Sequence, residues 1–360
     1  MIIMLVHGAK AAKDKRPHRA LVLISSLCLS ILISACSTEP SAEERLSIFH
    51  STKQEQLQET IWFTGDTTVT NEDRLDLFFP HVRNLGGGYI GVGSGQNFSL
   101  AGRARSDWIW LMDFTEVVVA ANKINIAFVR HAEQPEEFRR LWDRPAEEDA
   151  LRIIDQEYAD DPDLEFIKKA WSVSLPFQQK RFRTDDVVMQ KYNYELWLKN
   201  KDDYNHIRKL ALENRIQAVK GDLRGPITVL SIADAARKMQ VPVRVIYFSN
   251  AEEYFDLDGQ FRTNWLNMPV DDASMLVRTI SVQQHRFPWA PGSEHSTERG
   301  FHYNVMPARL YQAWLRDSAP GLRSRDILAH GEIDTENGFS IVRSGPPQSE
   351  IPAANSPEAP

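Results

Sequence analysis

Residues 89–98 read YIGVGSGQNF, which is an apolar strand, a glycine-rich turn and the start of a helix. The glycines Gly91, Gly93 and Gly95 let the backbone turn sharply and let a ligand approach main-chain N–H groups closely. Asn97 is the expected cap of the helix that follows. The G-x-G-x-G spacing is shorter than the full dinucleotide fingerprint, so a tight strand-to-helix turn without a ligand remains an alternative.

Strands and helices alternate along the rest of the chain. Further strands are predicted at residues 108–112, 216–219, 241–248, 275–282 and 301–305, with helices at 115–129 and 226–239. This alternation predicts an α/β fold of the Rossmann-like class, with a mostly parallel sheet flanked by helices. The interval 131–215 is dense in charge and has helical spacing, so it is predicted to be a helical insertion between the second and third strands.

Polar residues stand at the ends of several predicted strands. Asp113 ends the second strand, twenty residues beyond Gly93, where a carboxylate can accept hydrogen bonds from ribose hydroxyls. Asp222 follows the third strand, and the pair Ser249 and Asn250 follows the fourth. Because ligands of open α/β sheets bind outside the carboxyl ends of the strands, these side chains are expected to face one cleft.

Each of these residues also has an ordinary structural interpretation. Asp113 and Asp222 can be solvated residues in loops that follow strands. Asn250, with Glu253 three residues later, can belong to a helix capping box.

The histidines of the C-terminal part suggest a metal site only weakly. His285, His295 and His302 lie within an aromatic- and proline-rich stretch, but their spacing fits no common metal-binding pattern. We expect them to be surface residues of a hairpin, and we expect no metal. The sequence also contains no G-x-S-x-G or H-E-x-x-H motif, so the common hydrolase and zinc-protease classes lack support.

The N-terminus has the order of a secretory signal. Five basic residues between Lys10 and Arg19 precede an uncharged apolar run at 20–35, which is short for a membrane span. The run ends in LISAC at residues 32–36 and resembles the bacterial lipobox. That resemblance implies cleavage after residue 35 and a lipid, including palmitate, on Cys36. An ordinary secretory signal or an uncleaved anchor is the alternative.

The location follows from the same resemblance. Ser37, in the second position of the mature chain, favours sorting to the outer membrane, facing the periplasm of the bacterial cell envelope. The membrane is then a partner through the lipid.

The composition of the mature chain excludes some functions. Removal of residues 1–35 takes away five of 42 Lys and Arg and one of 49 Asp and Glu, which leaves a net charge of −11. Such a charge argues against a nucleic-acid partner, because phosphates require a basic surface. Cys28 leaves with the signal and Cys36 carries lipid, so no disulfide is expected. The oligomeric state stays open.

The predicted organisation has four parts. Residues 1–35 form the signal peptide, 36–57 a polar tether with room for a short helix at its end, 58–320 the α/β domain, and 344–360 a proline-rich disordered tail.

Several segments together resemble a bacterial family of uncharacterised lipoproteins and related proteins with a class I S-adenosylmethionine-dependent methyltransferase-like fold. The matching segments lie at residues 70–72, 89–98, 113, 221–223, 247–254 and 276–278, within the span 60–315. The resemblance implies a seven-stranded sheet with the S-adenosylmethionine site at the carboxyl ends of its first strands. It places Gly91, Gly93, Gly95, Gln96 and Asn97 beside the methionine moiety, Asp113 at the ribose, Asp222 at the adenine edge, and Asn71 and Glu72 in a segment that closes over the site.

One position departs from that family pattern. Classical class I methyltransferases carry an acidic residue two positions before Gly91, which holds the methionine amino group. Here that position is Tyr89, and Gln96 or Glu72 would have to replace the acid.

Two functions therefore stand side by side. The first is methyl transfer from S-adenosylmethionine to a small or cell-envelope substrate, which needs mainly the positioning of donor and acceptor. The second is a non-catalytic lipoprotein that binds a small-molecule ligand on the same fold. The second is favoured by location, because S-adenosylmethionine is a cytoplasmic metabolite and the mature chain should lie outside the inner membrane. The sequence names no catalytic base.

Overall fold

The structure is a computed structural model that describes residues 39–56, 65–282 and 300–347. The predicted signal peptide 1–35, Cys36 and all but the first residues of the predicted tail 344–360 lie outside the described residues. The described residues from Pro40 onward belong to one compact unit.

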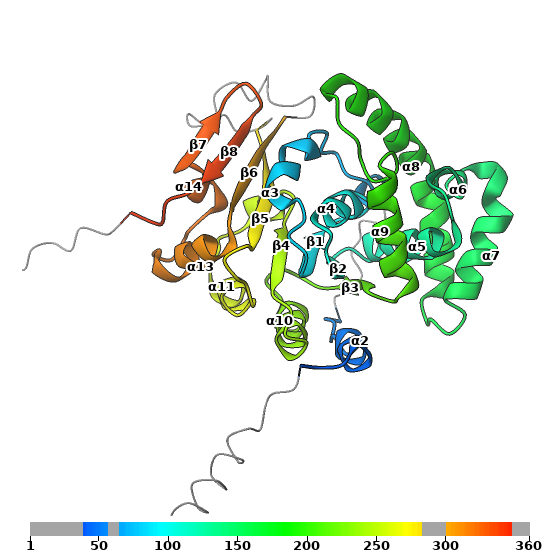
Figure 1. Ribbon diagram of the computed structural model, residues 1–360, viewed down its shortest axis with the longest axis horizontal. Helices are drawn as coiled ribbons and strands as arrows, with labels where there is room; N and C mark the ends of the chain where they lie inside the picture. The colour runs from blue at the N-terminus through cyan, green and yellow to red at the C-terminus, as the bar shows by residue number, and fades with distance from the viewer. Residues whose placement is uncertain (1–38, 57–64, 283–299, 348–360) are drawn as a thin grey trace, which may run out of the picture. The chain divides into compact units, whose positions relative to one another are not determined.

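The centre of the fold is a single open sheet (Figure 1). The described residues contribute eight strands to it, in the order β3-β2-β1-β4-β5-β6-β8-β7. Their bounds are β1 Gly88–Val92, β2 Trp108–Asp113, β3 Ile216–Lys220, β4 Val243–Tyr247, β5 Met275–Ser281, β6 Phe301–Pro307, β7 Gly331–Asp334 and β8 Phe339–Val342. The strands β3, β2, β1, β4 and β5 are parallel, whereas β6 runs antiparallel to β5. The result is an open, mostly parallel α/β sheet, which is compatible with a Rossmann-like fold.

The seven-stranded sheet that the resemblance implied is corrected to eight strands. The six strands predicted from apolar runs are present, and β7 and β8 add a hairpin beyond β6, with β8 parallel to β6. Each strand of the hairpin has only four residues, and β7 alternates half-buried with exposed positions. Such short edge strands lack the continuous apolar run that reveals a central strand in a sequence.

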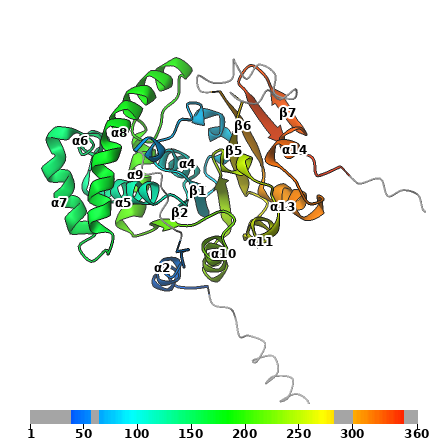
Figure 2. The ribbon, with the colours of Figure 1, turned by 180° about the vertical axis from the view of Figure 1, so that it is seen from behind.

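Helices cover both faces of the sheet, so its central strands are buried on both sides (Figure 2). In β2, Ile109 and Leu111 pack with α4 (Gln96–Ala104) and α5 (Glu116–His131) on one face. Trp110 and Met112 pack on the other face with α10 (Thr228–Lys238) and its neighbours. The other short elements are η1 Gly65–Thr68, η2 Leu75–Leu77, α3 Phe79–Val82, η4 Ala251–Tyr254, α11 Gly259–Leu266, α13 Ala308–Asp317 and α14 Ser324–Leu328.

The chain between β2 and β3 is helical after α5. It forms α6 (Pro135–Arg140), η3 (Arg144–Ala146), α7 (Glu147–Glu157), α8 (Leu164–Tyr192) and α9 (Lys201–Leu212). Helix α8 is the longest of these, with 29 residues, and it packs against α5 and η1. Nowhere in the described part of the chain is a helix both long and apolar enough to cross a membrane.

Part of the predicted tether 36–57 is folded onto the sheet. Helix α2 (Ala42–His50) begins with a capping box between Ser41 and Glu44. Its Phe49 is fully buried, with its ring against Trp108 and Trp110. This stretch therefore belongs to the core rather than to a free linker.

Candidate functional site

A large cleft opens at the carboxyl ends of β1, β2, β3 and β4. Its volume is about 820 Å³. The strand order reverses direction between β1 and β4, and such a switch point is where open α/β sheets bind ligands. Residues 67–71 and one side of α8 line the cleft opposite the strand ends.

Seven of the predicted site residues line this cleft: Asn71, Gly93, Gln96, Asp113, Asp222, Ser249 and Asn250. The other four do not. Gly95 lines a neighbouring pocket of about 50 Å³, while Gly91, Asn97 and Glu72 support the cleft from outside its lining.

The glycine turn is shaped by close contacts. Gly93 has a φ of +88°, in the left-handed region that favours glycine, and a β-carbon there would collide with the Gln96 side chain. A β-carbon at Gly91 would collide with Asn97. Gly95 is the N-cap of α4, and nothing lies within 4 Å of where its β-carbon would be, so the turn is open at this point.

Asn97 holds the turn from inside instead of capping α4, which corrects the predicted cap. It is fully buried, and its amide donates to the carbonyls of Val92 (3.2 Å) and Ser94 (2.8 Å). The Tyr89 hydroxyl donates to Asn97 Oδ1 at 2.7 Å. Tyr89 therefore fixes the turn through Asn97.

Asp113 joins the turn to the end of β2. Its Oδ2 accepts the N–H of Gly93 at 3.1 Å, and its Oδ1 accepts the N–H of Thr115 at 2.8 Å. Burial raises the pKa of Asp113 from 3.8 to about 6, against the lowering effect of these backbone N–H groups. Asp113 also lines the cleft, so a ligand can approach its carboxylate from that side.

The predicted pair Asn71 and Glu72 divides between the cleft and the interior. Asn71 is exposed and lines the cleft, whereas Glu72 is fully buried. The Glu72 carboxylate accepts hydrogen bonds from the hydroxyls of Tyr247, Ser249 (2.7 Å) and Thr279 (2.6 Å). Burial raises the pKa of Glu72 above its usual 4.5.

Asp222 forms a local turn at the mouth of the cleft. Its carboxylate accepts the N–H of Arg224 at 2.8 Å and pairs with the guanidinium of the same residue at 3.1 Å. An adenine amino group would have to share this carboxylate with Arg224.

Ser249 and Asn250 stand at the end of β4. Ser249 has a φ of +52°, an uncommon conformation for a residue with a side chain, and such strain is often found at functional sites. Asn250 Nδ2 donates to Glu253 Oε1 at 2.6 Å, but no capping hydrogen bond to the backbone of η4 forms. The alternative interpretation of Asn250 as a capping-box residue is therefore wrong.

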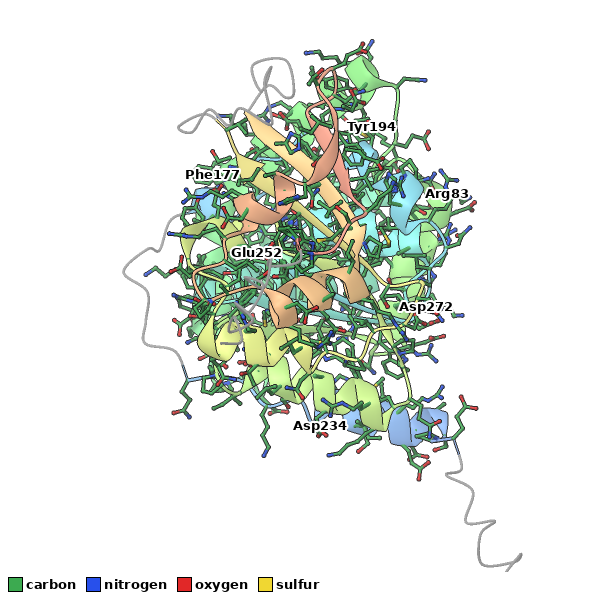
Figure 3. The ribbon with its side chains drawn as sticks, turned by 90° about the vertical axis from the view of Figure 1, so that its left-hand side faces the viewer. Arg83, Phe177, Tyr194, Asp234, Glu252 and Asp272 are labelled. Carbon is green, nitrogen blue, oxygen red and sulfur yellow. The ribbon has the colours of Figure 1, made fainter. Side chains whose placement is uncertain are left out.

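Sequence reasoning missed the aromatic and cationic lining. Phe114 is 53% exposed and Tyr254 72% exposed, although both line the cleft. Phe114 directly follows the strand-end Asp113, and that adjacency was the available signal. Helix α8 adds Phe177, labelled in Figure 3, and Lys180. No local pattern indicates that these α8 residues reach the cleft.

A buried ion pair ties α8 to the segment beside the cleft. Arg181 Nη1 lies 2.8 Å from Asp73 Oδ1, and its Nε donates to Asp185 Oδ1 at 2.7 Å. Both Arg181 and Asp73 are buried. The helical insertion is thereby fixed against the lining at residues 67–71.

The predicted histidines do not form a surface group in the described residues. His302 is buried on β6, with Nε2 2.8 Å from Ser340 Oγ, and burial lowers its pKa to about 4. The prediction of a surface position is therefore wrong for His302. His285 and His295 lie outside the described residues. Among the described residues, no group of three His, Cys, Asp or Glu side chains is arranged to hold a metal ion.

Comparison with known families gives one match. The family described as a domain of unknown function (DUF7790) matches residues 67–343, so the chain belongs to this family. The matched span begins at the cleft lining and ends one residue after β8. The comparison with curated proteins found no match.

Proposed function

We propose that this DUF7790 protein binds S-adenosylmethionine in the cleft and transfers its methyl group to a small or cell-envelope acceptor. The observation that carries the proposal is the convergence of the glycine turn, Asp113 and Asp222 on one cleft at the switch point of the sheet. A volume of about 820 Å³ lies within the range of sites for small molecules and cofactors. We also propose that the fold is of the class I methyltransferase type.

The order of the strands suggests how the ligand lies. Asp222 follows β3, Asp113 ends β2 and Gly93 follows β1, and these three strands are neighbours in that order. The adenine would lie at the end of β3, the ribose at Asp113, and the methionine moiety at the glycine turn. The exposed ring of Phe114 is available to stack on the adenine.

The residues present fit such a ligand at most points. Asp113 offers acceptor sites to the ribose hydroxyls, and the open side of Gly95 leaves room beside the turn. Because Tyr89 is buried and bonded to Asn97, the methionine ammonium group must be held by other acceptors. Gln96 and Asn71 line the cleft and can serve there. When bound, the ligand supplies a methyl group activated by its positive sulfur.

Calorimetry of the full chain in detergent micelles tests the proposal. We expect micromolar binding of S-adenosylmethionine and of its demethylated product, S-adenosylhomocysteine. Asp113→Ala should weaken both by at least about tenfold, since it removes the ribose acceptor and releases Gly93. Asp272→Ala is the matched control, because Asp272 is 92% exposed and does not line the cleft. Failure of both nucleosides to bind would disprove the proposal.

A second candidate is a binding protein without transfer activity. Tyr89 stands where classical class I methyltransferases carry an acidic residue, and this favours the second candidate, because a catalytic donor needs its methionine end held firmly. Incubation with S-adenosylmethionine and a cell-envelope extract separates the two. Formation of S-adenosylhomocysteine above the level of the Asp113→Ala variant supports transfer, whereas binding without product supports the second candidate.

We also propose that the protein is a lipoprotein of the bacterial envelope, held to the outer membrane by lipid on Cys36. The support is the order of charge, apolar run and small residues before Cys36. Cys36→Ser should release the protein from membranes into the soluble fraction. Unchanged membrane retention would contradict the lipid anchor.

A further inference from the structure

Glu72 is a buried carboxylate whose direct partners are hydroxyl groups. Three of them, from Tyr247 on β4, Ser249 after β4 and Thr279 on β5, donate to its two oxygens. Hydroxyls stabilise a carboxylate by hydrogen bonding but bring no opposite charge. A carboxyl group in such surroundings is well suited to gain and lose a proton.

Other elements that face Glu72 add little compensating charge. Tyr89 on β1 and Tyr303 on β6 lie within its electrostatic reach, and burial raises the pKa of both well above the ordinary value of 10.0. They therefore remain neutral near neutral pH. Arg181 on α8 also acts on Glu72, but its guanidinium already pairs with Asp73 and Asp185.

Ser249 connects this carboxylate to the cleft. Its side chain is partly exposed, lines the cleft, and donates its hydroxyl to Glu72 Oε1 at 2.7 Å. Tyr247 and Thr279 also donate to Glu72 but do not line the cleft. Of the three hydroxyls, Ser249 is the one that a ligand can reach.

Ser249 follows the strand next to β1, so it would lie near the methionine end of the proposed ligand. Asp222, Asp113 and the glycine turn follow β3, β2 and β1, and the next strand in the sheet is β4. If the adenosyl group lies beside Asp222 and Asp113 and the methionine moiety beside the glycine turn, the end of β4 would be the next strand end along the cleft. Ser249 is two residues beyond the end of β4.

We infer that Glu72 receives the proton of the methyl acceptor through the hydroxyl of Ser249, so that the acceptor is an alcohol, a thiol or an amine. This inference rests on the proposed function and names its substrate class. Ser249 is the catalytic residue of the pair, because it would touch the acceptor. Glu72 is the positioning residue that acts through it.

The step balances with these groups. The acceptor atom attacks the methyl carbon with its electron pair, and the carbon–sulfur bond breaks with its electrons remaining on sulfur. The proton of the acceptor passes to Ser249 Oγ while the Ser249 proton passes to the Glu72 carboxylate. The products are the methylated acceptor, S-adenosylhomocysteine and a neutral Glu72, which returns its proton to water once the cleft is empty. A raised pKa brings Glu72 nearer to that of an efficient base at neutral pH.

The test uses two ligands whose difference lies at the reacting centre. S-adenosylhomocysteine has no group in the place of the methyl, whereas sinefungin carries a primary amine there. Calorimetry of the full chain in detergent should show sinefungin binding about tenfold more tightly at neutral pH, because its ammonium group is held by Ser249 and compensated by Glu72. In acid the preference should shrink, since a protonated Glu72 no longer offers the charge.

Three variants separate the relay from a purely structural role of Glu72. Glu72→Gln and Ser249→Ala should abolish the preference for sinefungin while S-adenosylhomocysteine binds as before. Thr279→Val removes a hydroxyl that touches Glu72 but does not line the cleft, so it should keep the preference, although the pH at which the preference shrinks should rise. Should Glu72→Gln fail to fold, Ser249→Ala decides alone.

Some outcomes would overturn the relay, and another would contradict the proposed function. Equal affinities of the two ligands in the wild type, or a preference that survives in Ser249→Ala, would overturn the relay. Equal weakening of both ligands in Glu72→Gln and Ser249→Ala would assign the cluster a structural role and would also overturn it. Failure of S-adenosylhomocysteine itself to bind would instead contradict the proposed function on which the relay rests.

Discussion

Glu72 and Glu252 are two buried glutamates in different surroundings. Glu72 is 0% exposed and Glu252 is 2% exposed. Glu252 Oε2 lies 2.9 Å from Arg278 Nη1, and its Oε1 accepts the hydroxyl of Tyr311 at 2.5 Å. Glu72, in contrast, has hydroxyls as its direct partners. Figure 3 labels Glu252 near the middle of the view.

The difference separates a structural carboxylate from one that can exchange a proton. In the Glu252 site both charges are buried and neutralise each other, so removal of either leaves an uncompensated charge. In the Glu72 site, no arginine or lysine among the described residues contacts the carboxylate directly, so its protonation leaves no directly paired cation without its counter-charge. The pair also differs in access, because Ser249 connects only Glu72 to the cleft.

The largest expected effect on the free energy of unfolding comes from breaking the ion pair of Glu252 and Arg278. Glu252→Ala should lower the free energy of unfolding by about 3–5 kcal/mol, because Arg278 stays buried without its counter-charge. Denaturant unfolding followed by circular dichroism measures the loss. Glu72→Ala should cost clearly less, since it leaves no charge behind.

The exposed pair of Asp272 and Arg309 is the control for this measurement. Their side chains are 92% and 59% exposed, so Asp272→Ala should leave the unfolding transition where it was. An equal loss in Glu72→Ala and Glu252→Ala would remove the distinction between the two glutamates.

Asp113 is a third buried carboxylate, whose partners are backbone N–H groups and the Thr115 side chain, and it gives an intermediate effect. Its pKa is raised from 3.8 to about 6, so the folded state favours the protonated form. Its contribution to stability is present below pH 3.8 and is lost as the pH rises through about 6. Relative to Asp113→Asn, the wild type should therefore lose on the order of 3 kcal/mol across this interval.

Unfolding of both proteins at a series of pH values measures this difference. The side-chain amide that Asp113→Asn introduces has no charge, so the curve of the variant should be flatter in that interval. If the free energies of unfolding of wild type and Asp113→Asn followed parallel curves against pH, the pKa of Asp113 would not be raised. Asp113 would then not belong in the comparison of buried carboxylates.

The smallest expected effect concerns one hydroxyl. Thr279→Val should lower the free energy of unfolding by about 1 kcal/mol at neutral pH, because Glu72 loses one of its three donors. The loss of that donor raises the pKa of Glu72 further, so the destabilisation should diminish in acid, where the carboxyl is protonated. Thermal unfolding at neutral and acidic pH measures both quantities.

Thr263→Val provides the matched control for Thr279→Val. Thr263 is exposed on α11, and its hydroxyl donates to the carbonyl of Gly259 within the same helix. The destabilisation caused by Thr263→Val should therefore be the same at neutral and acidic pH. A destabilisation by Thr279→Val that is the same at both pH values would mean that Glu72 does not titrate in this range.

The central strands and the glycine turn could be predicted because their signals are local. The apolar runs at 89–92 and 108–112 appear as β1 and β2, since strands buried on both faces need continuous apolar residues. Asp113 could be placed at a strand end for the same reason. Whether these residues bind a nucleoside stays a prediction.

The hydroxyl cluster around Glu72 and the α8 lining of the cleft depended on contacts between distant parts of the chain. Glu72 and Thr279 are separated by 207 positions, yet they share a hydrogen bond at 2.6 Å. Residues of α8 reach the cleft because the insertion packs against α5 and η1, and no periodicity within α8 records this.

The sequence by itself therefore determined the alternation of elements, the turn at residues 91–95 and the acidic residue at the end of β2. The spacing of apolar residues and the backbone freedom of glycine act over a few neighbouring residues, so the sequence shows them directly. The tertiary structure alone decided that Glu72 is buried among hydroxyls and that Ser249 connects it to the cleft. It also decided that Glu252 forms a buried ion pair with Arg278. Burial and charge compensation depend on which strands become neighbours, and that arrangement is set by the packing of the whole sheet.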